Sequence, residues 1–141
     1  MAIESNPTCL CIEVRGAAQQ LTRAYDLALA PAGITVTQFS QLHSINSLES
    51  PTLKMLAEET QLDRSTLGRN MHLLDSMGLV KIQAGRDART KTVQLTPKGM
   101  TAYKNAGPLW YAIQSKTTAK LGKIKHQLLK ELLAELSHTS Q

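Results

Sequence analysis

Three basic side chains are crowded into a short polar segment, Ala84–Thr92, between two runs that alternate apolar and polar residues. The segment is too polar to be buried, and its charges could bind the phosphates of a nucleic acid. Because an arginine on a loop tip fits the narrow, strongly negative minor groove of DNA, we expect Arg89 to enter that groove. Arg86 and Lys91 would bind the flanking phosphates, whereas Asp87, which phosphate repels, would hold an arginine or cap the turn. The alternative is a solvated run of charges.

A second set of polar residues has the spacing of one helix face. Between Asp63 and Met77, a period of about 3.6 residues places apolar side chains together and short polar side chains opposite them, with one arginine. Arginine can bond guanine bidentately, and serine or threonine can reach base edges or phosphates, so this face could read a DNA groove. Since any surface helix has a polar face, simple solvent exposure is the alternative for this helix taken alone. The apolar side comprises Leu67, Met71 and Leu74, and the polar side comprises Ser65, Arg69 and His72, with Thr66 at its edge.

The charge of the whole chain favours the same kind of partner. Lys and Arg number 16 and Asp and Glu 11 in 141 residues, which gives a net charge of +5. Residues 61–104 carry that entire excess, and a concentrated basic region binds nucleic acid more often than an anionic membrane surface. No apolar run approaches the roughly 20 residues of a membrane span, and the N-terminus lacks the pattern of a secretion signal. We therefore expect a cytoplasmic protein with no membrane partner.

The elements that must position these residues are mostly helices. Helical periodicity changes to the period of a strand only after Gly78, in the two runs that flank the basic segment. The order helix, short turn, helix and hairpin predicts a mainly α fold with a small two-stranded β wing, the winged helix-turn-helix. The expected helices are a first one over Leu10–Ala28, a second capped by Thr35, a third with Ser50 as its N-cap and Pro51 in its first turn, a fourth capped by Asp63, and a last region capped by Thr96, with interruptions at Gly107–Pro108 and near Gly122.

These residues carry a resemblance to a known family. The run Leu53–Gly99 resembles the DNA-binding core of the MarR family of bacterial transcriptional regulators, and the likeness extends with less specificity over nearly the whole chain. Gly68 departs from the family pattern, which commonly has a larger polar residue there, so one base contact is in doubt. The specific parts are Leu56-Ala57-Glu58, Ser65-Thr66-Leu67, Leu74 with Gly78-Leu79-Val80, Asp87-x-Arg89, and Leu95-Thr96-x-Lys98-Gly99.

The resemblance implies a function and assigns residues to it. Such a protein is a homodimer that binds a pseudo-palindromic operator in double-stranded DNA, usually as a repressor, and is released by a small ligand or by cysteine oxidation. By position, the resemblance places base recognition on Ser65, Thr66, Arg69 and Asn70, and wing contact on Arg89.

An apolar stripe near the C-terminus supports a dimer independently of the family. The stripe is too close to the chain end to be enclosed by its own chain, so a partner surface would cover it. Packing of the first and last helices on one another within a monomer is the alternative. We expect dimerisation helices over residues 1–34 and 100–141, on either side of a DNA-binding domain over residues 35–99. The stripe consists of Leu121, Ile124, Leu128, Leu132 and Leu136.

The residues that would control the protein are harder to identify. Cys9 and Cys11 are separated by one residue near the N-terminus, which suggests an oxidant sensor, although free cysteine is also an ordinary small core residue. A ligand pocket between the dimer helices and the DNA-binding lobe is implied by the resemblance, with Tyr25, Phe39 and Trp110 as lining, and isolated aromatics of this kind are equally core residues. Two thiols are too few for a metal site, and the histidines lack ligand spacing, so we expect no metal and no cofactor.

Two other classes of protein compete with a DNA-binding regulator. The sequence contains no nucleophile elbow, phosphate loop, paired carboxylates or metal cluster, and so does not predict an enzyme. A winged-helix adaptor that binds proteins, and uses its charge only for solubility, is the main alternative.

Overall fold

Helix starts follow the capping residues of the sequence. In the computed structural model, Thr35 precedes α2 (Val36–Leu48) and its side chain accepts a hydrogen bond from the backbone N–H of Gln38 at 3.2 Å, while the Gln38 side chain accepts one from the Thr35 N–H at 3.0 Å. Asp63 precedes α4 (Arg64–Ser76) and accepts from the N–H of Thr66. Thr96 precedes α5 (Pro97–Ser137) and accepts from the N–H of Gly99. These side chains satisfy backbone donors that a helix leaves free, which confirms three predicted caps.

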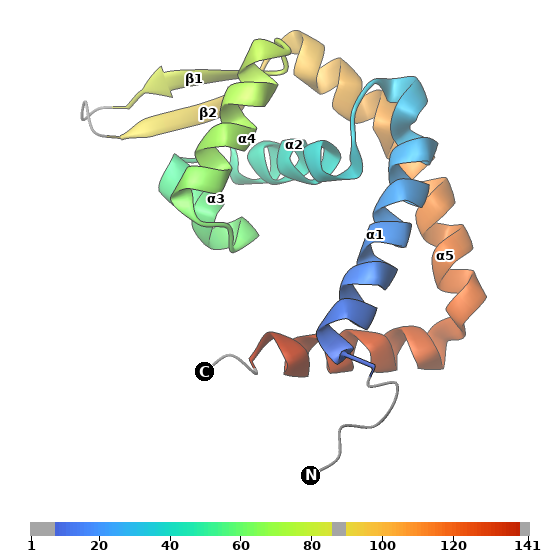
Figure 1. The fold of residues 1–141 in the computed structure, drawn as a ribbon. Coiled ribbons are helices and arrows are strands. Elements are labelled where there is room, and N and C mark those ends of the chain that lie inside the picture. Colours follow the sequence, from blue (N-terminus) through green and yellow to red (C-terminus); the bar gives the residue numbers. More distant parts are fainter. Residues whose placement is uncertain (1–7, 86–89, 139–141) are drawn as a thin grey trace.

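The structure describes residues 8–85 and 90–138. Helix α1 (Leu10–Leu29) packs along α5, and the two form one edge of the molecule in Figure 1. Beyond the short 3-10 turn η1 (Ala30–Ala32), helix α2 crosses the middle of the fold to reach α3 (Leu53–Thr60) and α4. Helices α3 and α4 and the hairpin form a lobe at the opposite side from α1. The expected class, mainly helical with a two-stranded wing, is confirmed.

The hairpin consists of β1 (Val80–Ala84) and β2 (Lys91–Leu95), which pair antiparallel from Val80 opposite Leu95 to Ala84 opposite Lys91. Val80 and Val93 are fully buried, so one face of the hairpin belongs to the core and the hairpin projects from it. Residues 86–89 of the basic segment, which include Arg86, lie outside the described residues.

The predicted N-cap at Ser50 is wrong. Helix α3 is capped instead by Thr52, whose side chain accepts from the N–H of Met55 at 3.1 Å. The carbonyl of Pro51 accepts a hydrogen bond from the N–H of Val93 at 2.9 Å, and Thr52 forms an isolated bridge with Thr92. Pairing with the distant strand β2 therefore keeps this segment extended and delays the helix.

A cluster of hydrogen bonds joins the end of α4 to the start of α5. Thr96 donates its hydroxyl to the carbonyl of Gly78 at 2.5 Å, and the Lys98 Nζ donates to the carbonyl of Met77 at 2.9 Å. A Cβ at Gly99 would lie 1.9 Å from the carbonyl oxygen of Leu79, so only glycine fits there. The Leu95-Thr96-x-Lys98-Gly99 motif thus fixes the turn between α4 and β1 to the start of α5.

The long helix α5 bends once. Gly122 has φ 80° and ψ 163°, outside the helical region, and the expected interruption there is confirmed. In Figure 1 the helix turns at this region and its last part crosses below the beginning of α1. The interruption expected at Gly107–Pro108 is wrong, because backbone angles stay helical there. Ala106 is fully buried before the proline and Trp110 packs on the core after it, so packing on both sides holds the helix together.

Candidate nucleic-acid interface

Helix α4 presents two different faces. Leu67, Met71 and Leu74 are almost completely buried, as the periodicity predicted. They attach the helix to the core, and the opposite side, with one guanidinium and short polar groups, is free to meet a partner. On that side Ser65, Arg69 and His72 are exposed, and Thr66 and Asn70 are half-buried.

A chain of hydrogen bonds orders the beginning of this polar side. Ser65 donates its hydroxyl to the carboxylate of Asp63, and the Arg69 Nη2 donates to the Thr66 Oγ1 at 3.3 Å. Hydrogen bonds from the Ser65 and Thr66 side chains, and from the Thr66 N–H, lower the pKa of Asp63 from 3.8 to about 2. Asp63 is therefore ionised at neutral pH, and the arginine is linked to it through Thr66.

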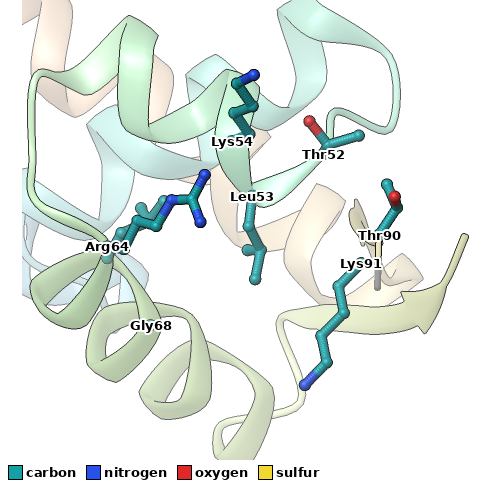
Figure 2. A pocket seen from close by; sticks show the side chains of 8 residues that line it. Thr52, Leu53, Lys54, Arg64, Gly68, Thr90 and Lys91 are labelled. Carbon is teal, nitrogen blue, oxygen red and sulfur yellow. The ribbon is translucent and has the colours of Figure 1, made fainter. Parts of the chain in front are cut away.

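A hollow of about 370 Å³ lies between α3, α4 and the hairpin, and three basic residues line it. Figure 2 shows Arg64 reaching in from the start of α4 and Lys91 extending from β2 toward α4, with Lys54 at the rim. Leu53 supplies an apolar wall, and Gly68 leaves the side of α4 open. Figure 2 shows the Nζ atoms of Lys54 and Lys91 at opposite ends of the view, with the Arg64 guanidinium between them. The hollow is therefore surrounded by positive charge, which favours contact with a phosphate backbone.

Sequence reasoning missed Lys54 and Arg64 as members of this surface. Arg64 belongs to the basic block of residues 61–104, whereas Lys54 lies outside it. Their spacing in the sequence does not predict that either residue lies near Lys91. The three residues surround one hollow because α3 and α4 pack beside the hairpin.

The described part of the wing includes Lys91 but does not include the tip of the loop, residues 86–89. Lys91 is exposed at the first position of β2, opposite Ala84. The N–H of Gly85 donates to the carbonyl of Thr90, which closes the base of the loop. Arg86, Asp87 and Arg89, which the sequence assigned to phosphate binding, wing ordering and minor-groove insertion, lie outside the described residues.

Apolar side chains of α1 and α5 lie exposed along the edge away from the hairpin. Leu128 is 50% exposed, Ile124 85% and Leu27 of α1 79%. These are large exposed fractions for leucine and isoleucine, and the single chain leaves these side chains uncovered. Of the predicted stripe, Leu121 is half-buried, and Ile124, Leu128, Leu132 and Leu136 are exposed.

The two cysteines occupy different backbone environments. Both thiols are free and exposed. Cys9 is the residue before α1 and has extended backbone angles, whereas Cys11 lies in the first turn of that helix. In the ranges that the structure describes, no group of three His, Cys, Asp or Glu side chains is placed to hold a metal ion.

The three predicted pocket aromatics are engaged in contacts within the chain. Phe39 is buried and stacks with Tyr103 and Trp110, with ring centroids 5.4 and 5.8 Å apart. The Tyr25 hydroxyl donates to the Gln114 Oε1 at 2.5 Å, which ties α1 to α5. The stacked rings of Phe39, Tyr103 and Trp110 join α2 to α5.

None of the helices in residues 8–85 and 90–138 has the length and apolar character that crossing a membrane requires.

Several solved structures are similar to this chain. The M. tuberculosis transcriptional regulator MosR, in complex with DNA, is 39% identical, and the match covers 93% of this chain and 99% of MosR with a TM-score of 0.80. A mutant of MarR from E. coli, complexed with operator DNA, is 26% identical over 90% of this chain and 92% of that one, with a TM-score of 0.81. MepR from S. aureus, also in a DNA complex, has a TM-score of 0.82 at 17% identity, covers 96% of this chain and 100% of MepR, and shows the shared fold alone. No protein-family model and no curated protein matches the sequence.

Proposed function

The chain belongs to the MarR family of winged helix-turn-helix transcriptional regulators, and from this premise we propose that it binds a pseudo-palindromic operator as a homodimer and represses transcription until a small ligand or thiol oxidation releases it. The proposal depends most on one observation. The exposed polar side of α4, which carries Arg69, lies beside the hollow that Lys54, Arg64 and Lys91 line.

Each element has a distinct part in the proposed complex. Helix α4 enters the major groove, where Arg69 can bond guanine O6 and N7, and Ser65, Thr66, Asn70 and His72 face base edges or phosphates. The cations of the hollow bind one stretch of phosphate backbone, which positions the helix without reading sequence. Arg86 and Arg89 of the wing tip continue the contact toward the neighbouring minor groove, with Asp87 ordering the loop.

Dimerisation follows from the uncovered apolar edge. Burial of the exposed leucines of α1 and α5 against a second copy removes apolar surface from water, at about 25 cal/mol per Å². A two-fold dimer places two copies of α4 on one side, and their separation must match one turn of DNA, roughly 34 Å. We assign dimerisation to residues 1–34 and 100–141 and DNA binding to residues 35–99.

Release would act on the same dimer. Cys9 and Cys11 are exposed at the start of α1, where oxidation would add bulk or a crosslink to the dimerisation region and change the spacing of the α4 pair. A small ligand that binds between the long helices and the DNA-binding lobe, near Tyr25, Phe39 and Trp110, would act in the same direction. A variant with both cysteines replaced by serine would stay bound to DNA under peroxide if the thiols are the sensor.

Selection from a random pool of DNA duplexes tests the proposal. The protein should enrich a pseudo-palindromic site whose half-sites are centred about 10 base pairs apart. A pool that stays random after repeated rounds would contradict the proposal and favour a protein-binding adaptor.

Two substitutions then separate base reading from phosphate binding. Arg69→Ala should lower affinity for the enriched site by roughly 1–3 kcal/mol more than for random DNA. Lys91→Ala should weaken both equally and reduce the salt slope by about one unit. Lys116→Ala removes a charge from an exposed position of α5 and serves as the control, with little effect on either. Equal losses on both DNAs for Arg69→Ala would show that this residue touches only phosphate.

A further inference from the structure

The hydroxyl group of Ser65 has a fixed hydrogen-bond direction. Ser65 lies in the first turn of α4, is exposed, and hydrogen-bonds the carboxylate of Asp63. An ionised carboxylate only accepts hydrogen bonds, so the serine must be the donor. Hydrogen bonds lower the pKa of Asp63 to about 2, so the carboxylate is ionised at neutral pH.

Neighbouring contacts make Asp63 the centre of this polar surface. The N–H of Thr66 donates to the Asp63 Oδ2 at 3.3 Å, and the Arg69 Nη2 donates to the Thr66 Oγ1 at 3.3 Å. The carboxylate therefore orients a serine, a threonine and, through the threonine, the guanidinium. This orientation exists before any DNA is bound, which lowers the cost of ordering these side chains in a complex.

The direction of the serine hydrogen bond limits what Ser65 can read. A hydroxyl has one proton and two acceptor lone pairs. Because the proton points to Asp63, only the lone pairs are free, and these accept hydrogen bonds but cannot donate one. In the major groove, adenine N6 and cytosine N4 are donors, whereas guanine O6 and thymine O4 are acceptors. Phosphate oxygens are acceptors as well and are excluded for the same reason.

We propose that Asp63 is a positioning residue that makes Ser65 a hydrogen-bond acceptor, so that the operator carries adenine or cytosine at the base facing Ser65. The inference rests on the proposed DNA-reading function of α4 and adds to it a base class and the residue that sets it. A serine without this carboxylate could turn its proton outward, and it could then hydrogen-bond either to a donor base or to an acceptor base.

The substitution Asp63→Gly tests the inference while keeping the helix. Ser65 and the Thr66 N–H both bond the same Asp63 oxygen, Oδ2, so an asparagine whose amide oxygen took that position would still hold the serine proton. Glycine as an N-cap costs only about a few tenths of a kcal/mol, and it removes the acceptor, which frees the serine proton for the DNA. Thermal unfolding at neutral pH should confirm that the variant is folded.

A charge-matched control is available on the same helix. Asp75 is exposed near the end of α4, and Asp75→Asn removes an equal charge far from the Ser65 hydroxyl. Loss of either negative charge raises affinity for all DNA, so absolute affinities do not discriminate between the two variants. Ratios of affinity between operator variants cancel this general effect.

The readout is the base preference at every position of the selected operator. Ser65→Ala identifies the base pair that Ser65 reads, because the preference there disappears. At that position the wild-type protein should prefer adenine or cytosine on the contacted strand by roughly fivefold, the strength of one neutral hydrogen bond. Asp63→Gly should reduce this ratio to about one. Asp75→Asn should leave it unchanged, and Asp63→Gly should have no further effect on the ratio in a Ser65→Ala background.

Three results would overturn the inference. Because every base pair carries adenine or cytosine on one strand, the first is an affinity that stays unchanged when a base analogue removes the adenine N6 or cytosine N4 amino group of the pair that Ser65→Ala identifies. The second is an unchanged ratio in Asp63→Gly, and the third is a Ser65→Ala variant with wild-type preferences throughout. In each case the wild-type protein still selects a specific operator, so the proposed function stands. Failure of the wild-type protein to select any operator would instead refute the proposed function, and the inference with it.

Discussion

Replacement of Gly68 by alanine should stabilise the protein. Glycine in the interior of a helix costs about 0.8–1.0 kcal/mol relative to alanine, because the unfolded chain has more freedom to lose. Gly68 lies within α4, and a Cβ built there meets no atom within 4 Å. The methyl group would project into the open hollow beside Arg64 and Lys91, so no clash offsets the gain.

The expected gain can be measured as a shift in thermal or urea unfolding. A gain of about 1 kcal/mol raises the melting temperature by roughly 3–5 °C for a domain of this size. Gly99→Ala is the matched control, because that Cβ would lie 1.9 Å from the Leu79 carbonyl oxygen and 2.8 Å from its carbon. The control should lose at least about 1–3 kcal/mol, since the contacted atoms are backbone. Gly68→Ala with an unchanged or lowered melting temperature would refute the placement of Gly68 at an open position of a regular helix.

Three further outcomes follow from individual contacts. Gln41 is 4% exposed, and in the described part of the chain its Nε2 has no hydrogen-bond partner, so Gln41→Leu should raise stability by up to about 1–3 kcal/mol in urea unfolding. Hydrogen bonds lower the pKa of Asp63 from 3.8 to about 2, so the unfolded chain binds the proton first as pH falls. The stability that this carboxylate contributes is complete above pH 3.8 and is lost toward pH 2, and the difference in urea midpoint between the wild type and Asp63→Asn should narrow over that range. Leu128→Glu should give monomers or insoluble protein in light scattering, because an unpaired charge would be buried in the dimer interface. Lys130→Glu, about 200° around the same helix, is the control and should keep the dimer. A dimer for both variants would place the interface elsewhere.

The sequence predicts those parts of the fold that depend on neighbouring residues. Thr35, Asp63 and Thr96 were recognisable as caps because each bonds an N–H three residues ahead. The two faces of α4 follow from the helical repeat alone. The bend at Gly122 is equally local, since its φ of 80° lies in a region that glycine adopts at little cost.

The predictions that failed depend on contacts between distant parts of the chain. The cap at Ser50 was displaced because Pro51 hydrogen-bonds Val93, more than forty positions away along the chain. The helix continues through Pro108 because the core holds it on both sides, which the local cost of proline does not reveal.

The residues of the candidate interface show the same difference between local and long-range information. Ser65 and Arg69 were found from one helix, whereas Lys54 and Arg64 join the surface only through tertiary packing of α3, α4 and the hairpin. Periodicity within one segment carries no information about which segments meet.

The most direct test of DNA recognition is the dissociation constant of the wild-type protein for its selected duplex and for a scrambled duplex of the same composition, measured at several salt concentrations. The selected duplex should bind at least about a thousandfold more tightly, and both affinities should fall steeply with salt as bound phosphates release counterions. Equal affinity for the two duplexes, or binding that salt does not weaken, would contradict the assignment of α4 and the wing to DNA recognition.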